Sequence, residues 1–122
     1  MLMSDAGGAL GLSQGNPVTI SFDDTAAVSL PDEFVAITNG TYKPSNYLNS
    51  SSNPATTNDT FSVAPAGLSI PSGPYSTSLA GFKGLNPNGE WYLYIVDDSA
   101  LDSGVVLGGW SLRITSVSTV NP

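Results

Sequence analysis

Three aspartates lie close together in the run VDDSALDSG, residues 96–104: Asp97, Asp98 and Asp102. Calcium takes several oxygen ligands from carboxylates, carbonyls and water, so a turn with carboxylates at this spacing can converge on one ion. The spacing is not that of an EF-hand loop. The alternative is that Asp and Ser populate turns because their side chains bond nearby backbone amides. Both interpretations stay open, and calcium at Asp97, Asp98 and Asp102 is the predicted metal site.

A second acidic pair, Asp23 and Asp24 in FDDTA, allows the same two interpretations. Paired carboxylates could also be the acid and base of a glycosidase, but neighbours on a strand point to opposite faces. The chain has no histidine and no cysteine, which excludes Ser-His-Asp and Cys-His catalysis and nearly every zinc site. A hydrolase that uses carboxylates alone stays open only because ten acidic residues exist. We therefore expect a protein that is not an enzyme.

The overall charge limits the kinds of partner that the chain can bind. Ten acidic residues against three basic ones give a formal charge of −7, so phosphate backbones and anionic lipid surfaces would repel the chain. No apolar run approaches the length of a membrane span. Charged residues make up 11%, well below the roughly 25% usual in globular proteins. We expect neither nucleic acid binding nor membrane insertion, and an extracellular or cell-surface location.

Alternating apolar residues predict several short strands. In PVTISF, residues 17–22, Val18, Ile20 and Phe22 share one face. EFVAI at 33–37 and TFSVA at 60–64 are weaker candidates, each bounded by Pro, Gly or Asn. These segments predict half-buried strands.

The two strongest strand patterns lie near the C-terminus. EWYLYIV, residues 90–96, is apolar or aromatic on both faces, which predicts a strand that is covered on both sides or central to its sheet. GWSLRITSV, residues 109–117, alternates apolar with polar residues, which predicts one buried and one exposed face. By this alternation Trp91 and Trp110 lie on core faces, so we expect packing anchors rather than sugar-binding platforms. The turn NPNGEW at 86–91 leads into the first of these strands.

The expected fold is all-β, a jelly-roll-like β-sandwich. Nine prolines and thirteen glycines break every window that could form a helix. A chain of this length can bury a core between two packed layers, which favours a sandwich or jelly roll over an open sheet. We expect one domain, residues 1–122, with a polar surface loop around 49–59. Three N-x-Ser/Thr triplets begin at Asn39, Asn49 and Asn58, and chance produces such triplets easily in a chain rich in these residues.

The run FKGLNPNGEWYLYIVDDSALDSGVVLGGWSLRI, residues 82–114, resembles the end of the proprotein convertase P domain, particularly its relatives in bacterial secreted proteins. MLMSDAGG and VTISFDD are similar to the middle of that family. The resemblance implies a jelly-roll β-sandwich, a non-catalytic role beside proteases or in other exported proteins, and calcium in some members. By this resemblance, the acidic residues of the family's turn correspond to Asp97, Asp98 and Asp102. The tryptophans that anchor its strands correspond to Trp91 and Trp110.

The family's domain normally opens with strands that carry D-[LV]-x-[IV]-x-L and S-P-x-G patterns, and no such segment precedes MLMSDAGG. An unpaired sheet edge is therefore expected, which is a template for another strand. The predicted function is a structural module of an exported bacterial protein that self-assembles through strand pairing into an extracellular polymer, filament or surface layer, with exchange by Met1–Met3 or Val117–Pro122. The alternative is a calcium-stabilised accessory P domain of a secreted protease on the same polypeptide.

Overall fold

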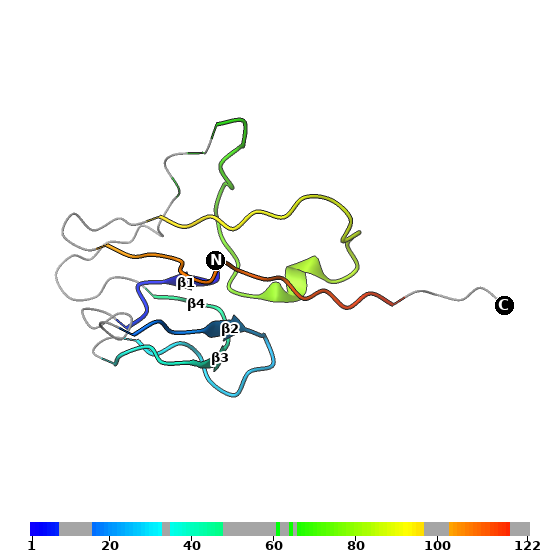
Figure 1. The fold of residues 1–122 in the computed structure, drawn as a ribbon. Coiled ribbons are helices and arrows are strands. Elements are labelled where there is room, and N and C mark those ends of the chain that lie inside the picture. The colour runs from blue at the N-terminus through cyan, green and yellow to red at the C-terminus, as the bar shows by residue number, and fades with distance from the viewer. Residues whose placement is uncertain are drawn as a thin grey trace. The chain divides into compact units, whose positions relative to one another are not determined.

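The computed structural model describes residues 1–7, 16–32, 35–47, 61, 64, 66–96 and 103–117. The chain divides into two compact units, Met1–Lys83 and Gly84–Pro122, and each is described by itself. Every labelled strand in Figure 1 belongs to the first unit. The polar loop expected around 49–59 lies outside the described residues.

The first two-stranded sheet joins β1 (Met3–Ser4) to β4 (Ser45–Asn46). The strands are parallel, with Met3 opposite Ser45 and Ser4 opposite Asn46. The Ser45 amide donates to the Leu2 carbonyl at 3.0 Å, and the Tyr47 amide donates to the Ser4 carbonyl at 3.2 Å. The N-terminal segment is therefore held by a strand that lies much later in the sequence.

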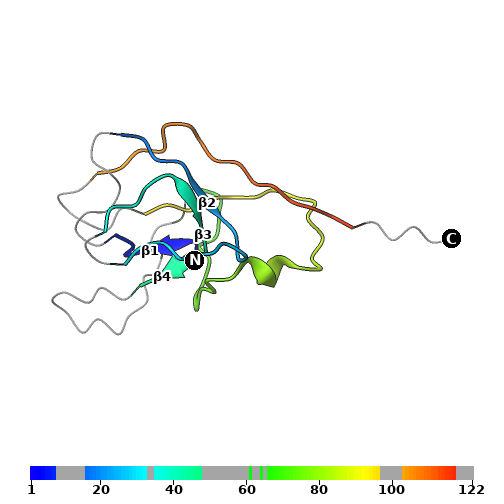
Figure 2. The same cartoon turned by 90° about the horizontal axis from the view of Figure 1, so that it is seen from below.

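The second sheet joins β2 (Ile20–Phe22) to β3 (Gly40–Tyr42), again in parallel. Figures 1 and 2 show these two strands side by side. Parallel strands need a long crossover connection, which here is residues 23–39. Ile20 and Phe22 are half-buried and Ser21 is exposed, as the alternation in PVTISF predicts. The predicted strand at 17–22 is confirmed over its second half.

The two strongest predicted strands do not form in the part of the chain that the structure describes. Neither 90–96 nor 109–117 is assigned as a strand, and both predictions are wrong for these residues. A strand is stable only when another strand satisfies its backbone groups, so alternation alone does not create one. Of the weaker candidates, EFVAI is described only over residues 35–37, where Ile37 is an isolated bridge residue, and TFSVA lies largely outside the described residues.

The buried hydrophobic core of the described residues lies in the first unit, at Leu30 and Ile37, each 1% exposed. Leu30 follows Ser29, which forms an isolated parallel bridge with Lys43. The Tyr47 hydroxyl donates to the Leu30 carbonyl at 2.6 Å, which satisfies a backbone acceptor beside a buried side chain. The core is therefore built between β2, β3 and the segments that connect them.

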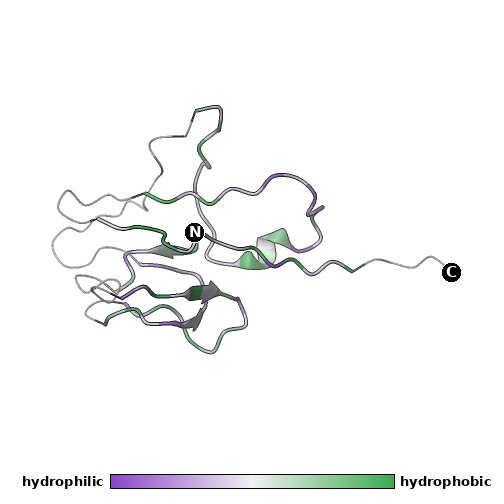
Figure 3. Cartoon of the chain, viewed as in Figure 1, coloured by the Kyte–Doolittle hydropathy of each residue, from purple (hydrophilic) through white to green (hydrophobic). Residues whose placement is uncertain are grey.

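The only helical element among the described residues is the 3-10 helix η2 (Leu79–Phe82). In the same residues no helix is long and apolar enough to cross a membrane. The described structure is non-helical apart from η2 and contains short strands in small sheets, which agrees with a β-rich class. Figure 3 shows that hydrophobic stretches occur in both units rather than in the strand-containing unit alone.

Candidate functional site

Asp24 accepts three hydrogen bonds from other described residues of the first unit. It lies in the turn after β2 and accepts hydrogen bonds from the Ser78 hydroxyl at 2.7 Å and from the Leu79 and Ala80 amides at 2.8 Å. These amides open η2 and have no acceptor within such a short helix. The hydrogen bonds from Leu79, then Ser78, lower the pKa of Asp24 below its ordinary value of 3.8. Asp24 therefore ties η2 to β2.

Asp23 closes its own turn. Its Oδ1 accepts from the Thr25 amide and the Thr25 hydroxyl, both at 2.7 Å, and its carbonyl accepts from the Ala26 amide at 3.0 Å. The Thr25 hydroxyl and amide lower the pKa of Asp23 below 3.8. The two aspartates thus bond to different partners. The turn interpretation is confirmed for Asp23, whereas Asp24 bonds residues 54–56 positions later in the chain.

The predicted metal ligands Asp97, Asp98 and Asp102 lie outside the described residues. Within the described part of the chain, no group of three or more acidic side chains could hold a metal ion. Calcium at these three aspartates therefore stays a prediction from the sequence.

The turn before residue 91 has the local geometry that NPNGEW predicts. The Asn86 side chain accepts from the Asn88 amide at 3.0 Å, and the Trp91 indole donates to the Pro87 carbonyl at 3.0 Å. The Tyr92 hydroxyl donates to Glu90 at 2.6 Å, and this bond raises the pKa of Tyr92. The turn therefore orients the first aromatic residues of the 91–96 segment.

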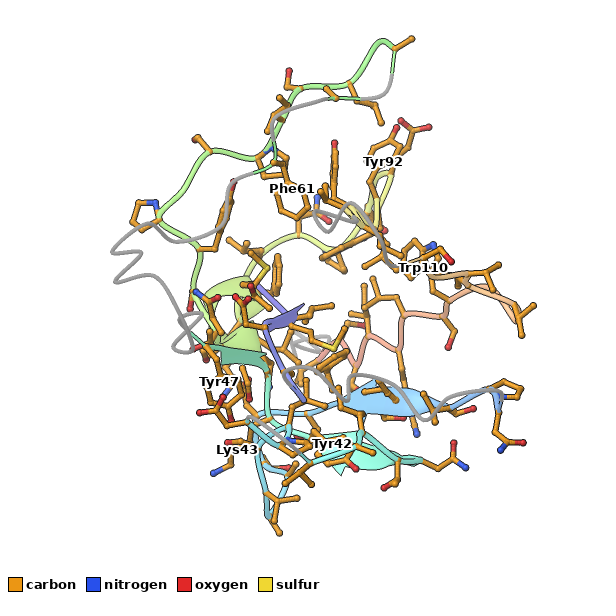
Figure 4. The ribbon with its side chains drawn as sticks, turned by 90° about the vertical axis from the view of Figure 1, so that its left-hand side faces the viewer. Tyr42, Lys43, Tyr47, Phe61, Tyr92 and Trp110 are labelled. Atoms are coloured by element: carbon orange, nitrogen blue, oxygen red, sulfur yellow. The ribbon has the colours of Figure 1, made fainter. Side chains whose placement is uncertain are left out.

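The prediction that Trp91 and Trp110 are core anchors is wrong. Trp91 is 36% exposed and Trp110 is 50% exposed, and Figure 4 shows the side chains of Trp110 and Tyr92. Burial of a tryptophan needs a second layer over its strand, and the described residues of the second unit do not supply one. The indole of Trp91 instead bonds to its own turn.

The second unit carries an apolar surface along its two strand-like segments, which we call the exposed strand pair: residues 91–96 and 105–114. Its large exposed side chains are Trp91, Tyr92, Leu93, Ile95, Val96, Val105, Val106, Leu107, Trp110, Leu112 and Ile114. Soluble monomers rarely expose large apolar patches, and large exposed apolar surfaces mark sites of association. Alternation predicted strands at 90–96 and 109–117, the second with one buried and one exposed face. It gave no signal for the exposed residues Val105, Val106 and Leu107.

The link from Asp24 to η2 was not found from the sequence. Asp24 and Ser78 are 54 residues apart, and no spacing pattern connects them. The signal that exists is local, because Ser78 is a common N-cap residue and accepts from the Ala80 amide at 3.1 Å.

Comparison of the chain with protein-family models, with curated proteins and with solved structures finds no match. The likeness to the P domain therefore stays a prediction that rests on the motifs themselves.

Proposed function

We propose that this protein is a non-catalytic structural module of an exported bacterial protein, with a jelly-roll-like β-sandwich completed by strands from a second copy of the chain. The observation that carries the proposal is the exposed strand pair. Its segments have the strongest strand patterns in the sequence, yet their large apolar side chains face solvent. An added strand would satisfy the backbone and bury these side chains at the same time.

The geometry of the ends favours the C-terminal segment as the exchanged strand. Met3 already pairs with Ser45 of its own chain, and the Met1 amino group donates to the Ser76 carbonyl. Val117 is 90% exposed. The rest of the candidate segment Val117–Pro122 lies outside the described residues. A head-to-tail contact through this segment would extend into a filament unless its rotation closes a ring.

The deciding experiment measures the size of native protein across a wide dilution range by sedimentation. Assembly at high concentration and dissociation on dilution would support the proposal. A folded monomer at every concentration would exclude it. A folded monomer that calcium stabilises would instead favour the alternative, an accessory P domain of a secreted protease.

A matched pair of variants tests the surface itself. Leu112 is 48% exposed and Ser111 is exposed beside it, and the alternation of the sequence assigns them to opposite faces of a strand formed on assembly. Full burial of a leucine side chain is worth about 1.5–3 kcal/mol, and about 1.4 kcal/mol is a tenfold change in affinity. Because Leu112 is 48% exposed, about half of that energy is available to assembly, and Leu112→Lys should weaken assembly by about three- to tenfold. Ser111→Lys adds the same charge and should change assembly little. Equal effects of the two variants would mean that charge, rather than the apolar face, governs association.

A further inference from the structure

The chain contains two Asn-Gly pairs, Asn39-Gly40 and Asn88-Gly89. In such a pair the backbone nitrogen of glycine can attack the side-chain carbonyl carbon of the asparagine, because glycine has no Cβ to hinder the approach. The reaction needs a glycine nitrogen that is free of hydrogen bonds and an asparagine side chain that can rotate. The two pairs differ in both respects.

Asn39-Gly40 is held at both reacting groups by the backbone of one residue, Thr19. The Thr19 amide donates to Asn39 Oδ1 at 2.6 Å, and the Gly40 amide donates to the Thr19 carbonyl at 3.1 Å. The second bond belongs to the β2–β3 ladder. The Gly40 nitrogen is thus directed away from the Asn39 side chain, and that side chain is fixed.

Asn88-Gly89 has neither restraint. Among the described residues, none accepts a hydrogen bond from the Gly89 nitrogen, and none bonds to the Asn88 side chain. Both residues are exposed. Gly89 has φ +133°, and a Cβ placed on it would meet no atom within 4 Å. Among the described residues, nothing therefore holds the Gly89 nitrogen or the Asn88 side-chain amide, and both residues are accessible to water.

We propose that Asn88 is a site of spontaneous deamidation, and that Asn39 is protected by the sheet. The Gly89 nitrogen loses its proton to solvent base and forms a bond to Asn88 Cγ, which closes a five-membered succinimide. The bond from Cγ to Nδ2 breaks, and the nitrogen takes up a proton and leaves as ammonia. Water then opens the ring at either carbonyl, which gives aspartate or isoaspartate.

Deamidation of Asn88 would change the turn that leads into the exposed strand pair. It places a new carboxylate two residues before Glu90, whose side chain already accepts from Tyr92. The isoaspartate form also adds a methylene to the backbone of the turn that precedes Trp91. The site is independent of the proposed function, because it depends only on the local geometry of the two pairs.

The test is to age the native full chain in warm, mildly alkaline buffer and to follow its tryptic fragments by mass spectrometry. Cleavage after Lys83 and Arg113 releases residues 84–113, whose asparagines are Asn86 and Asn88. Asn86 precedes a proline, which has no N–H to supply as the nucleophile. Loss of an amide from this fragment therefore reports Asn88. Asn39 is followed by fragmentation of the preceding peptide.

We expect amide loss at Asn88 to be many-fold faster than at Asn39 in the folded protein, with isoaspartate among the products. In denaturant the two rates should converge, since Thr19 no longer holds Asn39. Asn88→Gln should abolish the change in the 84–113 fragment, because its longer side chain does not form the five-membered ring. Similar rates at Asn39 and Asn88 in the folded protein would overturn the proposal, as would a stable Asn88.

Discussion

The two units of the chain differ in whether their strand-forming residues have partners. In Met1–Lys83 the strands are only two or three residues long, yet β1 pairs with β4 and β2 pairs with β3 in register. In Gly84–Pro122 the apolar alternation is longer and stronger, yet no described residue forms a ladder. The paired unit also holds the buried core at Leu30 and Ile37, whereas in the other unit Trp91, Tyr92 and Trp110 are exposed and Tyr94 is half-buried.

The difference teaches that strand propensity describes a surface rather than a backbone state. β-branched and aromatic residues favour strands because they pack against cross-strand neighbours, so the preference appears only when those neighbours exist. β2 has such a neighbour in β3, and residues 91–96 have none among the described residues. Residues 91–96 therefore combine a strong strand propensity with no strand assignment in the part of the chain that the structure describes.

The largest expected effect is the difference in stability lost when one isoleucine of each unit is replaced by alanine. Ile37→Ala should lower the free energy of unfolding by about 2–5 kcal/mol, because it leaves a cavity in a buried site. Ile95→Ala, at a side chain 63% exposed, should change it by about 0.5 kcal/mol or less in dilute protein. Urea unfolding of both variants at low concentration measures the difference. Equal losses would mean that the second unit has a core of its own, and the comparison would fail.

The second prediction asks whether calcium orders the turn between the two exposed segments. If Asp97, Asp98 and Asp102 bind the ion, calcium at a hundredfold excess over its Kd should stabilise the fold by about 2.7 kcal/mol. Thermal melting in chelator and then in millimolar calcium measures the shift. Asp102→Asn should remove most of it, while Asp32→Asn, which removes the same charge from the other unit, should keep it. An unchanged midpoint in the wild-type protein would rule out the site.

The sequence predicted the part of the fold that depends on local alternation. The pattern in PVTISF located β2, and the turn chemistry of Asp23 and of NPNGEW is as the residue types indicate. It did not locate β3, whose three residues begin with glycine and whose partner is reached only after residues 23–39. Ladder bonds join backbone to backbone, so they leave no side-chain signature of which strands pair.

The candidate site was predictable in its composition but not in its contacts. Both faces of EWYLYIV, residues 90–96, are apolar or aromatic, and this pattern predicts a strand that is covered on both sides or central to its sheet. The exposure of Tyr92 and Ile95 contradicts that prediction. The pairing of Asp24 with Ser78 depends on how the whole first unit folds, since 54 residues separate them. Neither feature follows from spacing along the chain.

A smaller effect tests whether a side-chain hydrogen bond stabilises the core of the paired unit. Tyr47→Phe removes the hydroxyl that donates to the Leu30 carbonyl at 2.6 Å and leaves that acceptor without this partner. The expected loss is about 0.5–1.5 kcal/mol in the free energy of unfolding. Tyr75→Phe is the matched control, because its hydroxyl bonds the nearby Pro71 carbonyl in an exposed segment. If the two variants lose the same stability, the bond to Leu30 has no special role in the core.

The smallest expected effect is a change in acid sensitivity at Asp24. Its pKa is lowered in the folded protein by the hydrogen bonds from Leu79 and Ser78, so folding favours the ionised form. The resulting stability is fully present above the ordinary value of 3.8 and is lost as the pH falls through the lower folded pKa. In that window the unfolded chain binds more protons than the folded one, and the stability of the wild-type protein decreases toward acid.

Asp24→Asn should remove this contribution, so the variant should be less stable at neutral pH and should lose less on acidification. The slope of stability against pH should differ from that of the wild type by less than one proton, and urea unfolding between neutral and strongly acid pH measures it. Ser78→Ala removes one donor and keeps the two backbone amides on Asp24, so its slope should be intermediate. If Asp24→Asn keeps the wild-type slope, the carboxylate does not tie η2 to β2. The paired unit would then owe its order to the sheets and the core alone.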